Sequence, residues 1–163
     1  MLRTKVGIEG AYLEQLATFS GPARDPRGWS VAIAYCALLP VQNLPPNRSD
    51  ISVVPLSALP QLPFDHRAIL DAALERVRSK SLYSSLPVHL CGETFTLPQL
   101  QQVYENILGE PLNKVSFRRK MDEMDWLEAV PGAMLGGGAH RPAQLYRAKP
   151  GFSQTLALTA RGL

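Results

Sequence analysis

Apolar residues recur at helical spacing in the second half of the chain. In the segment 66–80, Leu70, Leu74 and Val77 fall on one stripe. Asp65 stands directly before this segment, where its side chain can cap a helix. The pattern predicts an amphipathic helix from residue 66 to about residue 80.

Two further helices are predicted on either side of a short turn. Thr96 followed by Gln99 forms a capping-box pattern at the start of the first, and Gly109 supplies its left-handed stop. Asn113 can cap the second helix. The apolar residues of this second helix share one face: Phe117, Met121 and Met124. Two capped helices across a turn that contains glycine are typical of a helix-turn-helix.

Strand-like segments flank these helices. Residues 12–19 and 29–39 are rich in aromatic and aliphatic side chains, and the turn-forming stretch GPARDPRG between them predicts a β-hairpin. A short strand is predicted at residues 51–55. Residues 126–130 and 143–149 form a second pair of strands, joined by the flexible stretch PGAMLGGGAHRP. A hairpin with a glycine-rich tip after a helix-turn-helix predicts a wing.

Positive charge is concentrated in the second half of the chain, whose formal net charge as a whole is +3. No acidic residue follows Glu128, whereas several basic residues do: Arg141, Arg147, Lys149 and Arg161. This distribution is the electrostatic footprint of a protein that binds a polyanion such as nucleic acid.

The second helix of the predicted helix-turn-helix carries the strongest candidates for contact with DNA bases. Steps of about 100° per residue place Ser116, Arg119 and Asp122 opposite its apolar face and Arg118 and Lys120 on the flanks. In the major groove an arginine can bind guanine O6 and N7, while flanking cations neutralise phosphates. A solvated basic face that binds nothing is the alternative. The predicted DNA-binding set is completed at the start of the helix and on the wing: Asn113, Lys114, His140, Arg141 and Arg147.

No constellation of catalytic or metal-binding residues is recognised. Cys36 and Cys91 lie far apart, and we expect buried free thiols. Glu105 and Glu110 bracket a helix end and are expected to be solvated. The histidines are scattered, without the spacing of a metal-binding helix: His66, His89 and His140. We therefore predict no catalytic residue, no metal site and no bound cofactor.

Composition indicates a globular protein that stays in the cytoplasm. Hydrophobic residues make up 45% of the chain and charged residues 19%, as in ordinary soluble domains. No apolar run approaches the roughly 18 residues of a membrane span. The opening stretch MLRTKVGIEG lacks the apolar core of a signal peptide. We expect no membrane partner.

Two parts of the chain resemble known families. The stretch YLEQLATFSGPARDPRGWSVAIAYCALLP, residues 12–40, resembles the later strands of Nudix domains, especially the branch that acts on ADP-ribose, in which a loop like residues 24–28 joins two strands. The stretches LPFDHRAILDAALERVRSK, FTLPQLQQVYENILGEPLNKVSFRRKMDEMDWLE and GGGAHRPAQLYR resemble the C-terminal winged helix of Nudix-related transcriptional regulators of NAD metabolism, the NrtR type. The resemblance runs over nearly the whole chain.

The resemblance implies an α+β chain, with a partial Nudix-like β-rich region followed by a winged helix-turn-helix domain. The expected divisions are a truncated Nudix-like region for ligand binding and dimerisation at 1–62, the DNA-binding domain at 63–150 and a C-terminal tail at 151–163. The family implies a homodimeric repressor of genes for NAD synthesis or salvage, bound to a palindromic operator in double-stranded DNA. Its effector is expected to be ADP-ribose or a related nucleotide. Arg24 and Arg27 are the candidate ligand contacts, or simply part of a charged turn.

The start of the chain departs from the Nudix pattern. Residues 2–8, LRTKVGI, resemble only the end of the Nudix box, and Thr4 and Lys5 stand where two metal-binding glutamates belong. Either the chain begins at an internal methionine of a longer protein, or its Nudix half is genuinely shortened. In both cases we expect no diphosphate hydrolysis by this chain. The alternatives to a regulator are a Nudix hydrolase of nucleoside diphosphate derivatives, whose N-terminal catalytic part is missing here, and a basic module that binds protein.

Overall fold

The computed structural model of the chain describes residues 7–8, 10–44, 49–136, 142–152, 156 and 158. The chain divides into two compact units, one formed by residues 1–38 with 43–76 and the other by residues 39–42 with 77–163. The division falls within a helix, α2 (His66–Ser81), so this helix contributes to both units. The domain limits at residues 62 and 150 stay a prediction.

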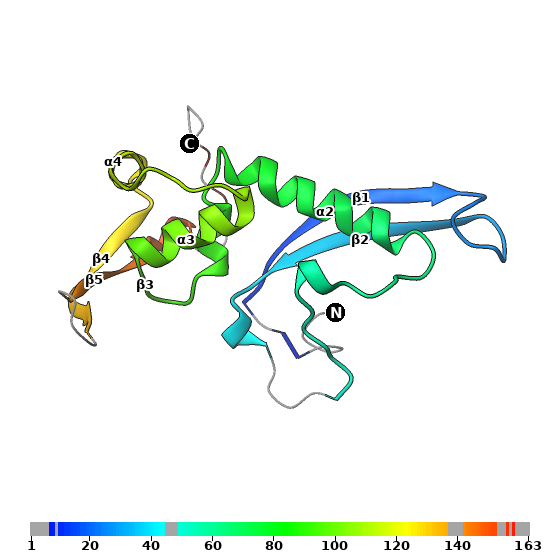
Figure 1. Cartoon of the computed structure of the whole chain (residues 1–163), viewed down its shortest axis with the longest axis horizontal. Coiled ribbons are helices and arrows are strands. Elements are labelled where there is room, and N and C mark those ends of the chain that lie inside the picture. Colours follow the sequence, from blue (N-terminus) through cyan, green and yellow to red (C-terminus); the bar gives the residue numbers. More distant parts are fainter. Residues whose placement is uncertain are drawn as a thin grey trace. The chain divides into compact units, whose positions relative to one another are not determined.

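The first unit is built on a long β-hairpin (Figure 1). β1 (Tyr12–Gly21) and β2 (Ser30–Leu38) pair in antiparallel register from Tyr12 opposite Leu38 to Gly21 opposite Ser30. One irregularity, between Gln15 and Ala17, shifts the register of β1. The predicted hairpin and its loop are confirmed.

The strand predicted at residues 51–55 is wrong. These residues form no strand, and a short 3-10 turn, Leu56–Ala58, follows them. Residues 52–55 are exposed, and no second strand lies beside them in the described part of the first unit. An unpaired strand would leave its backbone donors and acceptors without partners, which is why a favourable sequence alone does not form one.

The start of α2 lies one residue after Asp65, as predicted, and the helix ends one residue later than expected, at Ser81. The helix runs beside the hairpin of the first unit (Figure 1), where Arg76 joins it to β1. Arg76 Nη2 donates to the carbonyl of Leu16 at 3.1 Å, and Arg76 Nη1 lies 3.6 Å from Glu14 Oε1. These contacts fasten the helix to the middle of β1.

The second unit contains the two predicted helices of the helix-turn-helix. α3 (Leu97–Leu108) opens with the complete Thr96–Gln99 capping box and ends at Gly109, whose φ of 79° is left-handed. α4 (Lys114–Met124) begins at the Asn113 cap. Both helices and all three of these local signals are confirmed.

Three strands accompany these helices in the order β3-β5-β4. β3 (Phe95–Thr96) was not predicted, because two residues are too few to show a pattern. β5 (Ala143–Ala148) matches the prediction closely. β4 (Leu127–Leu135) runs further than predicted, through PGAML, so the prediction of a flexible loop over these residues is wrong.

A bulge explains why β4 continues across residues that normally end a strand. The register of β4 against β5 shifts between Ala129 and Met134, and Gly132 has a φ of 70°. Gln144 Nε2 donates to the carbonyl of Val130 at 2.8 Å and to that of Ala133 at 3.1 Å. The side chain of Gln144 thus replaces ladder hydrogen bonds that the bulge removes.

The core of the second unit lies where α3 and α4 pack together. Its buried residues are Val88, Phe95, Leu100, Tyr104, Phe117 and Met121. The rings of Tyr104 and Phe117 meet edge to face, with centroids 5.5 Å apart and planes inclined by 68°. Burial of one such side chain stabilises a fold by roughly 1.5–3 kcal/mol. This contact fixes the apolar face of α4 and thereby the face that points outward.

Candidate functional site

The start of α4 is held by the side chain of Asn113. Its Oδ1 accepts hydrogen bonds from the backbone nitrogens of Val115 at 3.1 Å and Ser116 at 3.0 Å. Asn113 was predicted both as a helix cap and as a DNA contact, and the structure confirms the first role. Its contact with DNA stays a prediction.

The turn between α3 and α4 is fastened by Glu105. Its Oε1 accepts from the backbone nitrogen of Leu112 and from Gln101 Nε2, each at 2.9 Å. Gln101 Nε2 also donates to the carbonyl of Leu112 at 2.9 Å. The hydrogen bond from Leu112, followed by that from Gln101, lowers the pKa of the Glu105 carboxyl. The expectation that Glu105 is merely solvated is therefore wrong: its charge fixes the residue that precedes the Asn113 cap.

The outward face of α4 carries most of the predicted base and phosphate contacts. With Phe117 and Met121 buried, the exposed side chains of its first half are basic, hydroxyl or aliphatic: Lys114, Val115, Ser116, Arg118 and Arg119. Lys120 is only half-exposed. Arg119 is 76% exposed, and its Nε lies 3.7 Å from Glu123 Oε1.

The acidic residues of α4 gather at its C-terminal end, where Asp122 and Glu123 are exposed. Because carboxylates repel phosphates, this end is unsuited to contact with a polyanion, whereas the first half is suited to it. Helices that read the major groove place their N-terminal residues against the base edges. The charge distribution along α4 has this polarity.

The predicted wing residues divide into described and undescribed positions. Arg147 on β5 faces Glu128 on β4 and donates from Nε to its Oε1 at 2.6 Å. The side chain of Arg147 is 54% exposed, so it forms a surface cross-strand pair that can be rearranged at modest cost. His140 and Arg141 lie outside the described residues, as do Thr4 and Lys5.

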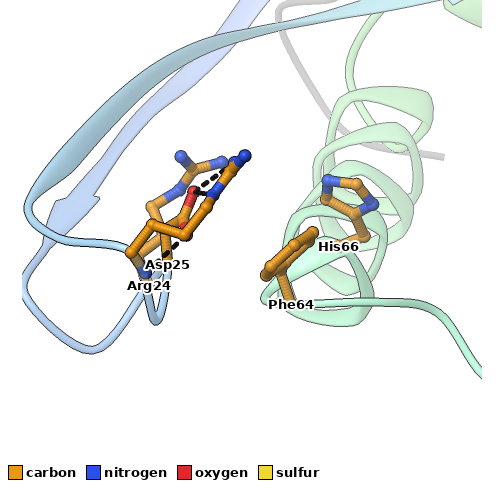
Figure 2. A pocket seen from close by; sticks show the side chains of 5 residues that line it. Arg24, Asp25, Phe64 and His66 are labelled. Carbon is orange, nitrogen blue, oxygen red and sulfur yellow. Dashed lines mark hydrogen bonds and ion pairs between the residues drawn. The ribbon is translucent and has the colours of Figure 1, made fainter.

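A second candidate site lies in the first unit, at the hairpin loop. Here a pocket of about 180 Å³ is lined by Arg24, Asp25, Arg27, Phe64 and His66. Figure 2 shows Arg24 and Asp25 on the loop and, facing them, Phe64 and His66 at the start of α2. The Phe64 and His66 rings meet edge to face with centroids 6.0 Å apart. The pocket thus combines cations, an imidazole and an aromatic ring.

Both arginines of the pocket already hold carboxylates. Arg24 Nε donates to Asp65 Oδ2 at 2.7 Å, and its Nη1 donates to Ser30 Oγ at 3.2 Å. Arg27 donates from Nη2 to Asp25 Oδ2 at 2.7 Å and from Nε to Oδ1 at 3.0 Å. The hydrogen bonds from Arg27 lower the pKa of Asp25 to about 2. An anionic ligand would therefore compete with these carboxylates for the guanidinium groups.

Two residues of this pocket were predicted from the sequence as ligand contacts. These are Arg24 and Arg27, which the structure brings to one pocket. The prediction missed Phe64 and His66, which lie about 40 residues away in the chain. No local sequence pattern indicates that these two residues belong to the pocket, because only the packing of α2 against the hairpin places them opposite the loop.

The described residues contain neither a metal cluster nor a membrane-spanning helix. No group of three or more His, Cys, Asp or Glu side chains gathers there in a way that could hold a metal ion. Within the same residues, no helix is long and apolar enough to cross a membrane. Cys36 and Cys91 form no disulfide and are half-buried rather than fully buried as expected, and burial raises the pKa of the Cys91 thiol to about 12.

Comparison with known sequences identifies relatives. The family model of the NrtR DNA-binding winged helix domain matches residues 87–148. The chain is 41% identical over 151 residues to a protein of Acinetobacter baylyi described as an ADPR responsive transcriptional repressor, NtrR, and the match covers 90% of this chain. The match spans 60% of the length of that curated relative.

Comparison with solved structures identifies relatives of the same family. The crystal structure of Shewanella oneidensis NrtR matches with a TM-score of 0.83 at 37% identity, over 99% of this chain and 74% of that one. The same protein complexed with a 27mer DNA matches with a TM-score of 0.84 at 36% identity, over the same shares of each chain. A MutT/nudix family protein from Enterococcus faecalis matches in fold, with a TM-score of 0.66 at 23% identity, over 90% of this chain and 66% of that one. The predicted α+β class, Nudix-like region plus winged helix, is confirmed.

Proposed function

This chain belongs to the NrtR family, and from that premise we propose that it acts as a sequence-specific, DNA-binding transcriptional repressor. The observation that carries the proposal is the first half of α4. It is fixed by the Asn113 cap, and its exposed Lys114, Arg118 and Arg119 face outward without an acidic residue among them. The relative from Shewanella oneidensis was solved with a 27mer DNA, which supports DNA as the partner.

The geometry of α4 suits insertion into the major groove. A helix fits this groove, and an arginine there can bind guanine through two hydrogen bonds. Arg119 lies on the outermost face of α4 and is the candidate for this contact, together with Ser116. Lys114, Arg118 and Lys120 are the candidates for phosphate contacts. Arg147 on β5 is a further candidate for contact with DNA, and His140 and Arg141 are candidates by their place in the sequence.

The pocket at the hairpin loop is the candidate effector site. The Acinetobacter baylyi relative is described as ADPR responsive, and ADP-ribose carries a diphosphate and an adenine. Arg24, Arg27 and His66 supply groups for the phosphates, and the Phe64 ring, 57% exposed, can stack on a base. The effector can regulate only if it binds the DNA-bound and free forms with different affinity. Genes of NAD synthesis or salvage, a homodimer and a palindromic operator complete the proposal.

The alternative function is hydrolysis of a nucleoside diphosphate derivative. It requires carboxylates that hold divalent metal ions, and in the resemblance of residues 2–8 to the end of a Nudix box, threonine and lysine at positions 4 and 5 take the places of glutamates. We expect no AMP when the full chain is incubated with ADP-ribose and magnesium and the mixture is resolved by chromatography. Clear turnover would replace the regulator by a hydrolase.

Binding to DNA tests the main proposal. Duplexes are selected by the full chain from a random pool, and the affinity for the recovered duplex is compared with that for a scrambled one by fluorescence anisotropy at two salt concentrations. We expect the recovered duplex to bind at least about 1000-fold more tightly than the scrambled one, as specific regulators do. Addition of ADP-ribose should change the affinity for the recovered duplex. Equal affinity for both duplexes would contradict the proposal.

A further inference from the structure

One apolar side chain on the outward face of α4 is not explained by packing. Val115 is 76% exposed, the highest exposure of any large apolar side chain in the described part of the chain. Most of its side chain therefore meets solvent and not the core. Valine also has a lower helix propensity than alanine, because its branched side chain loses rotamer freedom in a helix. The position therefore carries a small cost in stability.

The fold presents Val115 in a fixed way. Its backbone nitrogen donates to Asn113 Oδ1 at 3.1 Å, so its place in the first turn of α4 is set. A valine in a helix has one strongly preferred χ1 rotamer, so its two methyl groups also point in one direction. Val115 is thus a rigid apolar probe at the N-terminal end of the helix.

The neighbours of Val115 indicate which class of partner its side chain would contact. Arg119 lies one turn later on the same face, opposite the buried Phe117 and Met121. The other exposed residues around it are polar or charged: Lys114, Ser116 and Arg118. An apolar docking patch for a protein would need several adjacent apolar side chains, and these residues supply none. The surroundings are those of a surface that meets a polyanion.

On this basis we propose that Val115 reads sequence by packing its methyl groups against the 5-methyl group of a thymine. The inference rests on the proposed binding of duplex DNA by α4. The edges of the bases in the major groove carry hydrogen-bonding groups and one methyl group, that of thymine. An isopropyl side chain can bury the most apolar surface there against that methyl.

The spacing also relates this thymine to the guanine proposed for Arg119. Four residues along a helix advance it by about 6 Å, and successive base pairs are about 3.4 Å apart. A helix lying along the groove therefore places Val115 and Arg119 about one or two base pairs from each other. The two side chains together would specify a thymine and a nearby guanine.

Removal of single methyl groups tests the inference. The duplex that the full chain selects from a random pool is remade with each thymine replaced in turn by deoxyuridine, which deletes only the 5-methyl group. Affinities are measured by fluorescence anisotropy for the unmodified chain and for Val115→Ala. Val53→Ala is the matched control, since Val53 is also a strongly exposed valine, at 66%, in the other unit.

We expect one replacement to weaken binding of the unmodified chain and of Val53→Ala by about 4-fold, the value of one buried methyl-sized group. The same replacement should change the affinity of Val115→Ala by less than about 2-fold. Circular dichroism should show that Val115→Ala is folded, because alanine favours the helix. Specific binding in which every replacement affects Val115→Ala and the unmodified chain equally would overturn the role of Val115 alone. Absence of any sequence-specific binding would overturn both this inference and the proposed function.

Discussion

Arg24 holds the carboxylate of Asp65, its Nε donating to Oδ2 at 2.7 Å across 41 residues of sequence. Both side chains are largely shielded from solvent, with exposures of 15% and 22%. The second carboxylate oxygen of Asp65, Oδ1, is buried without a hydrogen-bond partner. The pair therefore joins the hairpin loop to the start of α2 through one strong contact, at the wall of the candidate effector pocket.

This pair predicts a gain of ligand affinity from the loss of a protein contact. An anionic ligand that binds Arg24 must break the ion pair between Arg24 and the Asp65 carboxylate. In Asp65→Asn the competing side chain is neutral, so less free energy is needed to displace it. We expect Asp65→Asn to bind ADP-ribose about 5-fold more tightly, as the loss of about 1 kcal/mol of competing interaction requires. Isothermal titration calorimetry measures this.

The matched control for that experiment is Asp71→Asn. Asp71 pairs with Arg67 on the same helix, at 3.0 Å, but both side chains are more than half exposed. We expect its affinity for ADP-ribose to be unchanged. If Asp65→Asn bound the nucleotide no better than Asp71→Asn does, Arg24 would not be a ligand contact.

The turn between α3 and α4 should weaken in acid through Glu105. Because hydrogen bonds lower the pKa of this carboxyl in the folded state, its contribution to stability is present above its ordinary pKa. That contribution is lost as the pH falls through the lowered value. Glu105→Gln should therefore have a lower Tm than the unmodified chain at about pH 7, and the difference should shrink as the pH falls through the lowered pKa of Glu105.

Thermal unfolding followed by circular dichroism at several pH values checks this prediction. Glu110→Gln is the control, because Glu110 is an exposed carboxylate of the same turn. A Glu105→Gln difference that stayed constant over the whole pH range would mean that the charge of Glu105 does not stabilise the turn.

The Tyr104–Phe117 contact should dominate the stability of the second unit. Phe117 is 3% exposed and packs its ring on that of Tyr104, so Phe117→Ala leaves a cavity and should cost about 3–5 kcal/mol. Urea denaturation would show this as a lower midpoint. The adjacent exposed residue supplies the comparison: Arg118→Ala should change the stability by less than about 0.5 kcal/mol. Similar losses of unfolding free energy in Phe117→Ala and Arg118→Ala would contradict the burial of Phe117 in the core.

Gln144 should hold the bulge of β4. Its Nε2 bonds the carbonyls of Val130 and Ala133, and Gln144→Ala leaves them without this donor, at a cost of about 1–2 kcal/mol. Hydrogen exchange should become faster in β4 and β5 and stay unchanged in α3. Gln102→Ala, which removes an exposed contact within α3, should leave exchange in the strands unaltered. Unchanged exchange in Gln144→Ala would rule out this role.

Local signals predicted most of the helix-turn-helix. Thr96 with Gln99, Gly109 and Asn113 each act on backbone groups within a few residues, so their effect can be read without knowing the fold. The outward face of α4 followed from helical spacing in the same way. The same spacing places Val115 beside Arg119, but a single exposed valine carries no charge or motif that marks it as a DNA contact.

Contacts between distant residues account for what the sequence did not reveal. The local rule assigned Asp65 to the cap of α2, whereas Arg24, far away in the chain, holds its carboxylate. Likewise the continuation of β4 depends on Gln144, and β3 exists only because β5 lies beside it. Such contacts leave no periodic trace in the sequence.

The most direct test of the proposal that α4 reads DNA bases compares Arg119→Ala with Arg118→Ala. Affinities of the full chain are measured by fluorescence anisotropy on the selected duplex and on its single-base variants at two salt concentrations. We expect Arg119→Ala to lose about 1–3 kcal/mol of binding free energy and its preference at one guanine. Arg118→Ala should weaken binding to all duplexes alike and reduce the salt dependence by about one ion. An Arg119→Ala variant that kept the full affinity and every base preference would contradict the placement of α4 in the major groove.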